Sequence, residues 1–292
     1  MLRMELLIDL RAELGEGPLW DEREQRLYWI DSLGALVHSC DAVGQGWRQW
    51  QVPGHIGSLA LCETGGAIVA LQDGFYRLDF ATGLSKKICD PDPGKPRIRL
   101  NDGKVDRQGR FIAGYMDYEE RDPICALFRL DTDLTSHKLA DGIICSNGPC
   151  WSPDGKLFYF ADTGTREIFV YDYDLATGNV SNRRLFACFA ALNLKGLPDG
   201  ATVDADGFIW SVSVYEGKLV RFAPDGTIDQ IVGLPVESTT SVSFGGPNLD
   251  VAYVTSMART VNGVAPRERA AGGLFAIHGL GVRGIAEPRF KH

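Results

Sequence analysis

Three short segments of the sequence place a metal-ligating side chain beside glycine and next to an apolar stretch. Glu16 lies in Leu-Gly-Glu-Gly-Pro-Leu-Trp, Asn147 in Ser-Asn-Gly-Pro and Asp199 in Leu-Pro-Asp-Gly. Taken singly, Asn-Gly and Pro-Asp-Gly are common β-turn sequences, and Glu16 could be an exposed turn residue. Taken together, two carboxylates and one amide oxygen suit Ca²⁺, Mg²⁺ or Mn²⁺, and carboxylate-rich sites also accept Zn²⁺. The segments predict one divalent metal ion if the fold brings them together.

The elements that must position these residues are short β-rich runs bounded by Gly, Pro, Asp and Asn, a pattern typical of all-β proteins. One run recurs at intervals of roughly 40 to 50 residues, the length of a four-stranded blade. Its six copies are 37–41, 75–79, 127–131, 168–172, 219–223 and 274–278. A related run precedes most copies, at 27–31, 158–162, 208–211 and 251–255. The repeat predicts a six-bladed β-propeller with four-stranded antiparallel blades.

Closure of six blades into a ring explains how distant residues could meet. The blades cover one another's faces, leave only short edges and surround a channel lined by the innermost strands. Glu16, Asn147 and Asp199 are each expected at the start of an innermost strand in a different blade, and hence at one channel mouth. A pair of β-sandwiches predicts no six-fold repeat, and a β-helix predicts a much shorter period. Both rivals therefore fit less well than the propeller.

We expect residues 1–292 to form one domain. The 292 residues and 45% apolar content suit a single all-β unit, and no linker divides the sequence. The proline- and glycine-rich stretch at 91–96 is expected to be a loop over the channel.

The composition also bounds the partners and the compartment. The 30 basic and 38 acidic residues give a net charge of −8, and the basic residues are scattered, so we expect no nucleic-acid partner. We find no signal peptide and no apolar run near the roughly 20 residues that span a membrane. The seven cysteines form an odd set without a Cys-x-x-Cys pair, which favours reduced, buried thiols. A cytoplasmic monomer or weak homo-oligomer is expected.

A fourth motif, Arg-x-Asn-Asp-Gly-Lys beginning at Arg99, completes a recognisable set. Together with Gly-Glu-Gly-Pro, Ser-Asn-Gly and Leu-Pro-Asp-Gly, it resembles the SMP-30/gluconolactonase/regucalcin-like family in order and spacing, over most of the chain. The resemblance implies a six-bladed propeller that holds its metal with Glu16, Asn147 and Asp199.

The same resemblance implies that Arg99, Asn101 and Glu119 contact the hydroxyl or carbonyl groups of a small sugar lactone. The match at Glu119 leaves room for exchange, because Asp117 and Glu120 are close enough for a small loop shift to swap their roles.

Two features depart from the family pattern. His55 puts an imidazole near a loop expected to face the channel, either as a structural residue or as a contact to a substrate hydroxyl. Cys150 stands where many relatives carry another residue. Neither departure removes a predicted metal ligand.

The predicted function is metal-dependent hydrolysis of an aldono-lactone, such as a gluconolactone or an arabinonolactone, to the free aldonate. The metal would polarise the carbonyl and Asp199 would accept a proton from the attacking water. No Gly-x-Ser-x-Gly or His-Glu-x-x-His motif supports a serine-esterase or zincin mechanism. Two alternatives stay open: a promiscuous metal-dependent esterase or phosphotriesterase, favoured by a wide apolar mouth, and a non-catalytic calcium-binding propeller.

Overall fold

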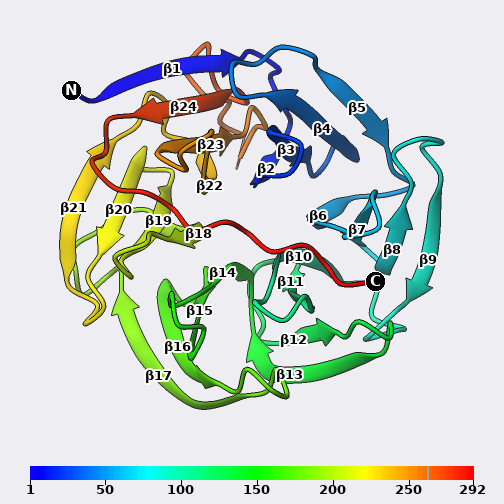
Figure 1. Cartoon of the computed structure of the whole chain (residues 1–292). Helices are drawn as coiled ribbons and strands as arrows, with labels where there is room; N and C mark the ends of the chain where they lie inside the picture. The colour runs from blue at the N-terminus through cyan, green and yellow to red at the C-terminus, as the bar shows by residue number, and fades with distance from the viewer. Residues whose placement is uncertain (262) are drawn as a thin grey trace.

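The computed structural model describes residues 1–261 and 263–292. Within that part of the chain the regular elements are strands, which form six four-stranded antiparallel sheets. The sheets stand as blades around a central axis (Figure 1). The predicted all-β, six-bladed propeller is confirmed. None of the described residues belongs to a helix that is long and apolar enough to cross a membrane.

Each blade contributes one strand at each distance from the axis. The innermost strands are β2 (Gly15–Asp21), β6 (Ile56–Leu61), β10 (Ile98–Val105), β14 (Ser146–Trp151), β18 (Leu197–Val203) and β22 (Thr239–Gly245). The second strands are β3 (Arg26–Asp31), β7 (Ala67–Leu71), β11 (Phe111–Asp117), β15 (Leu157–Asp162), β19 (Ile209–Val214) and β23 (Val251–Ser256).

The outer half of each blade is built in the same way. The third strands are β4 (Leu36–Asp41), β8 (Gly74–Leu78), β12 (Cys125–Leu130), β16 (Glu167–Tyr173), β20 (Lys218–Phe222) and β24 (Leu274–His278). The outermost strands are β5 (Arg48–Gln51), β9 (Ser85–Cys89), β13 (Ser136–Ile143), β17 (Val180–Cys188), β21 (Ile228–Gly233) and β1 (Arg3–Ile8). The six copies of the repeated run are the third strands, and the related run is the second strand of its blade.

The two ends of the chain close the ring. β1 pairs antiparallel with β24, from Arg3 opposite His278 to Ile8 opposite Leu274, so the first residues complete the blade that the last strands begin (Figure 1). Beyond β24 the chain crosses the centre of the ring (Figure 1). There Phe290 is fully buried and forms a bridge with Cys62 at the end of β6.

The crossing segment also enters the channel. The Lys104 ammonium of β10 lies 3.1 Å from the Glu287 carboxylate and donates to the Ala201 carbonyl of β18 at 3.1 Å. Both side chains of the pair are nearly buried, with 15% and 10% exposed. The C-terminal segment thus covers one channel mouth and is fastened inside it.

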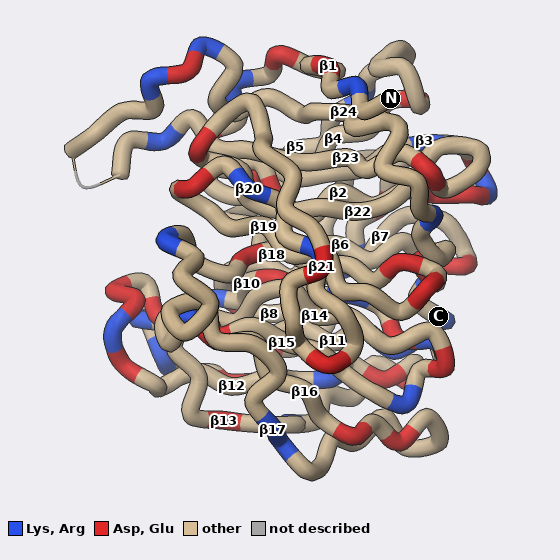
Figure 2. Tube along the Cα trace, turned by 90° about the vertical axis from the view of Figure 1, so that its left-hand side faces the viewer, with Lys and Arg blue, Asp and Glu red and all other residues tan. Residues whose placement is uncertain are grey.

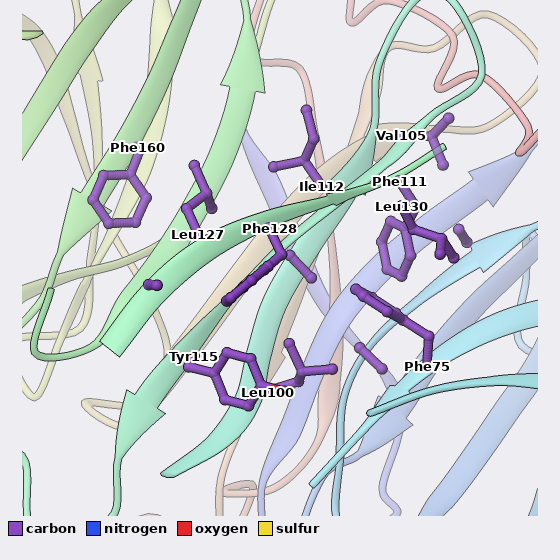
Figure 3. Packing of buried hydrophobic residues seen from close by; sticks show 14 of the residues in the cluster. Phe75, Leu100, Val105, Phe111, Ile112, Tyr115, Leu127, Phe128, Leu130 and Phe160 are labelled. Carbon is purple, nitrogen blue, oxygen red and sulfur yellow. The ribbon is translucent and has the colours of Figure 1, made fainter. Parts of the chain in front are cut away.

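The hydrophobic core lies between neighbouring blades. Figure 3 shows one such cluster, in which Phe75, Phe111 and Phe128 come from two adjacent blades. The Phe75 and Phe111 rings meet edge to face at 5.7 Å, and neither side chain is exposed. Burial of one such aromatic ring contributes roughly 2–3 kcal/mol. These contacts hold the blades at the spacing that the channel requires.

Candidate functional site

A β-bulge follows each of the three predicted metal ligands. Glu16, Asn147 and Asp199 lie near the starts of β2, β14 and β18, and the pairing with the second strand shifts register within the next few residues in each case. A bulge re-aims side chains at a sheet edge. The glycine-containing motifs are thus bulges in innermost strands rather than β-turns. The structure brings all three side chains to one cavity at the start of these strands.

Carboxylates at the end of the second strand, or just after it, hold the entry to each of these strands. In each case the carboxylate accepts a backbone N–H two or three residues before the predicted ligand. The contacts join Asp31 to Leu14 at 3.0 Å, Asp162 to Cys145 at 3.0 Å and Glu216 to Gly196 at 3.2 Å. Because each carboxylate comes from its own blade, the position of each predicted ligand is set by local contacts.

The two predicted carboxylate ligands lie close together, with Asp199 buried and Glu16 half-buried. Burial raises the pKa of Glu16 well above its usual value, and the charges of Asp199 and Asp102 raise it further. Burial likewise raises the pKa of Asp199, with added repulsion from Asp102 and Glu120. Within the described chain, neither Glu16 nor Asp199 has a cationic nitrogen within ion-pair distance, 4.0 Å. The charges of Arg99 and Arg259, which pair directly with neither carboxylate, oppose the rise in pKa of Glu16 and Asp199 only in part.

The amide of Asn147 is oriented by its neighbours. Its Nδ2 donates to the Thr163 hydroxyl at 2.9 Å, and its Oδ1 accepts from Asn101 Nδ2 at 3.1 Å. Asn101 also donates to the Ser146 carbonyl at 2.9 Å. Asn147 and Asn101, both singled out from the sequence, are thus in direct contact.

Arg99 is another predicted residue that lines the cavity. Its side chain is 4% exposed, and Nη1 donates to the Leu100 carbonyl at 3.0 Å. A guanidinium carries five N–H donors, so most of those on Arg99 are available to a molecule in the cavity.

Glu119 is the exception among the predicted site residues. It forms an ion pair with Arg121, its side chain is 47% exposed, and it does not line the cavity. Glu120 lines the cavity instead, with a left-handed backbone at φ 50°. Asp117, the other acid considered, is fully buried and pairs with Arg97 at 2.6 Å. Of the three acids, the structure brings only Glu120 into the cavity.

The two departures from the family motifs lie outside the cavity lining. His55 Nδ1 is 3.4 Å from the Tyr118 hydroxyl. Cys150 is 2% exposed, and burial raises the pKa of its thiol to about 12. Cys145 does line the cavity, yet burial raises its thiol pKa well above the usual value. A thiol with a raised pKa is a poor nucleophile, which agrees with the structural role expected for these cysteines.

Sequence reasoning missed several residues of the site. Asp102 is buried beside the two predicted carboxylate ligands. Because it directly follows Asn101 in the Asn-Asp-Gly motif, the sequence could have indicated that it lies at the site. Thr163 follows the strand-end Asp162, but nothing in its sequence context marks it. Tyr215 and Arg259 line the cavity from outside every motif, so only the folded structure could reveal them.

The donors present fit a divalent cation. Glu16 and Asp199 supply two mutually repelling carboxylates, and Asn147 supplies an amide oxygen. These are the oxygen ligands that hard divalent ions prefer. Among the described residues no three His, Cys, Asp or Glu side chains are arranged as a metal site. A cation here would therefore depend on the Asn147 amide as its third protein donor.

Comparison with known proteins agrees with this fold. The family model described as "SMP-30/Gluconolactonase/LRE-like region" matches residues 14–258. The chain belongs to this family, and members of it are named as lactonases.

Three similar proteins illustrate the range of names in the family. Regucalcin of Xenopus laevis is 35% identical over 99% of this chain and 98% of its own length. A 6-deoxy-6-sulfogluconolactonase of Pseudomonas putida is 35% identical over 95% of this chain and 94% of its own. The solved structure of a calcium-binding protein, regucalcin, from Agrobacterium tumefaciens matches with a TM-score of 0.90 and 26% identity, covering 98% of this chain and 97% of that one.

Proposed function

We propose that the protein is a metal-dependent lactonase that opens a sugar-acid lactone to the free acid. The observation that carries the proposal is the convergence of Glu16, Asn147 and Asp199 with Arg99 and Asn101 in one cavity. The family membership and the names of lactonase relatives support the same reaction class.

Glu16, Asn147 and Asp199 would hold one divalent cation. The cation would act as a Lewis acid that polarises the lactone carbonyl. The description of the Agrobacterium relative as calcium-binding supports Ca²⁺ as the first ion to test.

The chain's own residues would carry the remaining steps. Asp199 accepts a proton from a water molecule while the oxygen of that water attacks the carbonyl carbon. The bond between the carbonyl carbon and the ring oxygen then breaks, and the ring oxygen leaves as a hydroxyl by taking the proton back from Asp199. At neutral pH the new acid is ionised, so each turnover releases one proton to solvent.

Arg99 and Asn101 would orient the sugar. The free donors of Arg99 suit substrate oxygens, and the Asn101 amide is already fixed by Asn147 and Ser146. We assign to Glu120 the contact that the family resemblance gave to Glu119, because Glu120 lines the cavity. This polar, charged lining favours a polyhydroxylated substrate over the apolar ester of the esterase alternative.

The test is proton release from a panel of aldono-lactones at near-neutral pH. Chelated protein is resupplied with Ca²⁺, Zn²⁺, Mn²⁺ or Mg²⁺, one at a time. We expect metal-dependent turnover that Asp199→Asn abolishes and that Asp206→Asn, a change at an exposed aspartate, leaves intact. Metal binding without turnover of any lactone would refute the catalytic proposal and favour a calcium-binding propeller. Faster turnover of aryl esters or phosphotriesters would favour the esterase alternative.

A further inference from the structure

Two arginines line the walls of the cavity from different blades. Arg99 belongs to β10, and Arg259 follows β23. No carboxylate in residues 1–261 or 263–292 lies within the 4.0 Å ion-pair distance of either guanidinium. Arg99 is buried and Arg259 is half-buried, and a buried arginine is normally paired. Here both guanidiniums are available to an anionic group of a ligand that enters the cavity.

The hydrogen bonds of the two side chains lead to the same conclusion. Arg99 is 4% exposed, with the Leu100 carbonyl as the acceptor of one of its five donors. Arg259 Nε is buried and has no hydrogen-bond partner among the described residues. A buried donor without an acceptor costs free energy, and an anionic ligand oxygen would supply the missing acceptor.

Arg259 stands where two cavities meet. The inner cavity, with a volume of about 60 Å³, contains the predicted metal ligands and has room for only a few water-sized groups. The outer cavity, of about 430 Å³, shares Tyr215, Met257 and Arg259 with it. A lactone whose carbonyl reaches Asp199 would therefore extend past Arg259 into the outer cavity.

The charge around the inner cavity balances only when a cation is bound. The lining contains three carboxylates, from Glu16, Glu120 and Asp199, and two guanidiniums. The buried Asp102 carboxylate adds a fourth negative charge that acts on Glu16 and Asp199. A divalent cation adds two positive charges, so four positive charges then face four negative ones. The case for an anionic ligand therefore rests on the two guanidiniums that lack a carboxylate partner.

We propose that the preferred lactone carries an anionic oxygen-rich substituent, such as a carboxylate, phosphate or sulfonate, at the end away from its carbonyl, and that Arg259 binds this substituent together with Arg99. The planar guanidinium presents parallel N–H donors that match two oxygens of such a group. Tyr215 lies beside Arg259 and adds a hydroxyl at the same place. The inference rests on the proposed lactonase function and specifies its substrate class.

The first test compares pairs of lactones that differ only at the terminal carbon. One member has a terminal hydroxyl, and the others have a carboxylate, a phosphate or a sulfonate. We expect the wild-type protein to have a higher kcat/KM for the anionic members. Arg259→Gln should lower the anionic-to-neutral ratio by about 10- to 100-fold, the usual effect of losing a hydrogen bond to a charged group. Arg259→Lys should restore part of it.

The matched control is Arg267→Gln, which removes the same charge from an exposed position at the outer cavity. It should leave the ratio unchanged. An equal fall in both variants would mean that only long-range charge matters, and it would overturn the assignment to Arg259. A wild-type preference for the neutral members would overturn the substrate class. Among the three anions, the largest effect of Arg259→Gln identifies the preferred substituent.

A binding measurement separates this inference from the proposed function. Calorimetry on the Ca²⁺-loaded protein compares an open-chain sugar acid carrying one carboxylate with one carrying a carboxylate at each end. We expect tighter binding of the second, lost in Arg259→Gln. If that holds while no lactone is hydrolysed, the lactonase proposal fails and the anion site stands. If lactones are hydrolysed but neither binding nor kcat/KM depends on Arg259, the anion site fails and the lactonase stands.

Discussion

The hydroxyl of Thr163 fixes the direction in which the Asn147 amide points. Thr163 donates its single proton to the Pro198 carbonyl at 2.7 Å, so its oxygen can only accept from Asn147 Nδ2, at 2.9 Å. The amide nitrogen is thereby held on Thr163, and Oδ1 is left to accept from Asn101 Nδ2 at 3.1 Å. Pro198 directly precedes Asp199, so Thr163 links two of the three predicted ligands through one side chain.

Thr163→Val should therefore weaken metal binding while the fold is retained. Valine keeps the shape but removes the acceptor, and the Asn147 amide becomes free to rotate. Loss of a partner that orients a ligand typically costs about 10- to 100-fold in metal affinity. Calcium titration by calorimetry measures the effect, with the exposed Thr165→Val as the control. An unchanged affinity would show that the amide direction is set without Thr163.

The bulge at Gly148 leads to a second prediction. Gly148 has φ +56°, and a Cβ there would lie 2.8 Å from the Asp199 carbonyl oxygen. Gly148→Ala should therefore lower the free energy of unfolding by more than the roughly 1–2 kcal/mol expected from the left-handed backbone alone. It should also weaken metal binding, because Asp199 must move.

Gly142→Ala is the control for this prediction. Gly142 has φ +70°, but a Cβ there would meet no neighbouring atom within 4 Å, so the variant isolates the backbone cost. Urea denaturation and calcium titration of both variants measure the difference. Equal losses in the two variants would mean that the close approach to Asp199 carries no cost.

Much of this architecture could be predicted from the sequence, because the propeller repeats its signals. The run around Phe75–Leu78 recurs in every blade, and each copy forms the third strand of its blade. The candidate ligands share a local pattern in the same way: Asn147 and Asp199 are each a polar residue followed by glycine, and both lie at innermost-strand bulges. Because the same short pattern recurs from blade to blade, copies that are weak evidence singly predict the strand position when they are taken together.

Contacts made by single residues outside the repeat could not be predicted. Which of Glu119 and Glu120 faces the cavity depends on the left-handed backbone at Glu120, and residue type alone does not fix that conformation. Arg259 comes from a long connection without a motif, so its position depends on how that connection folds over the ring. Figure 2 shows the connection between β23 and β24 extending on the side opposite the C-terminus.

The buried pair of Lys104 and Glu287 leads to a third prediction. Lys104→Met should lower the free energy of unfolding by about 3–5 kcal/mol, because it leaves the Glu287 carboxylate buried without its partner. Adding Glu287→Gln should recover much of that loss, since the second change removes the stranded charge. Urea denaturation of the two single variants and the double variant measures the coupling. Additive losses would show that the pair does not fasten the C-terminal segment.

The last prediction concerns His38, which is enclosed in the blade of β4. Its side chain is fully buried, and the rings of Trp29 and Trp47 flank it at 5.2 and 5.8 Å. Neither ring nitrogen has a hydrogen-bond partner among the described residues. Burial lowers the pKa of His38 to about 4, with a small opposing effect from the charge of Asp31. The folded protein therefore holds this imidazole neutral.

The sign of the pH effect follows from the lowered pKa. In the unfolded chain the imidazole takes up a proton near pH 6.5, whereas the folded chain resists it until about pH 4. The stabilisation is complete above pH 6.5 and is lost progressively as the pH falls towards 4, by about 3 kcal/mol over the window.

His38→Phe keeps the aromatic stack but removes the titrating group. The unfolding free energy of this variant should fall less steeply than that of the wild type between pH 7 and pH 4.5, as measured by urea denaturation in the presence of chelator. His137→Phe, at an imidazole that is 52% exposed, should keep the wild-type slope. A His38→Phe variant with the wild-type slope would mean that His38 reaches solvent and titrates normally in the folded protein.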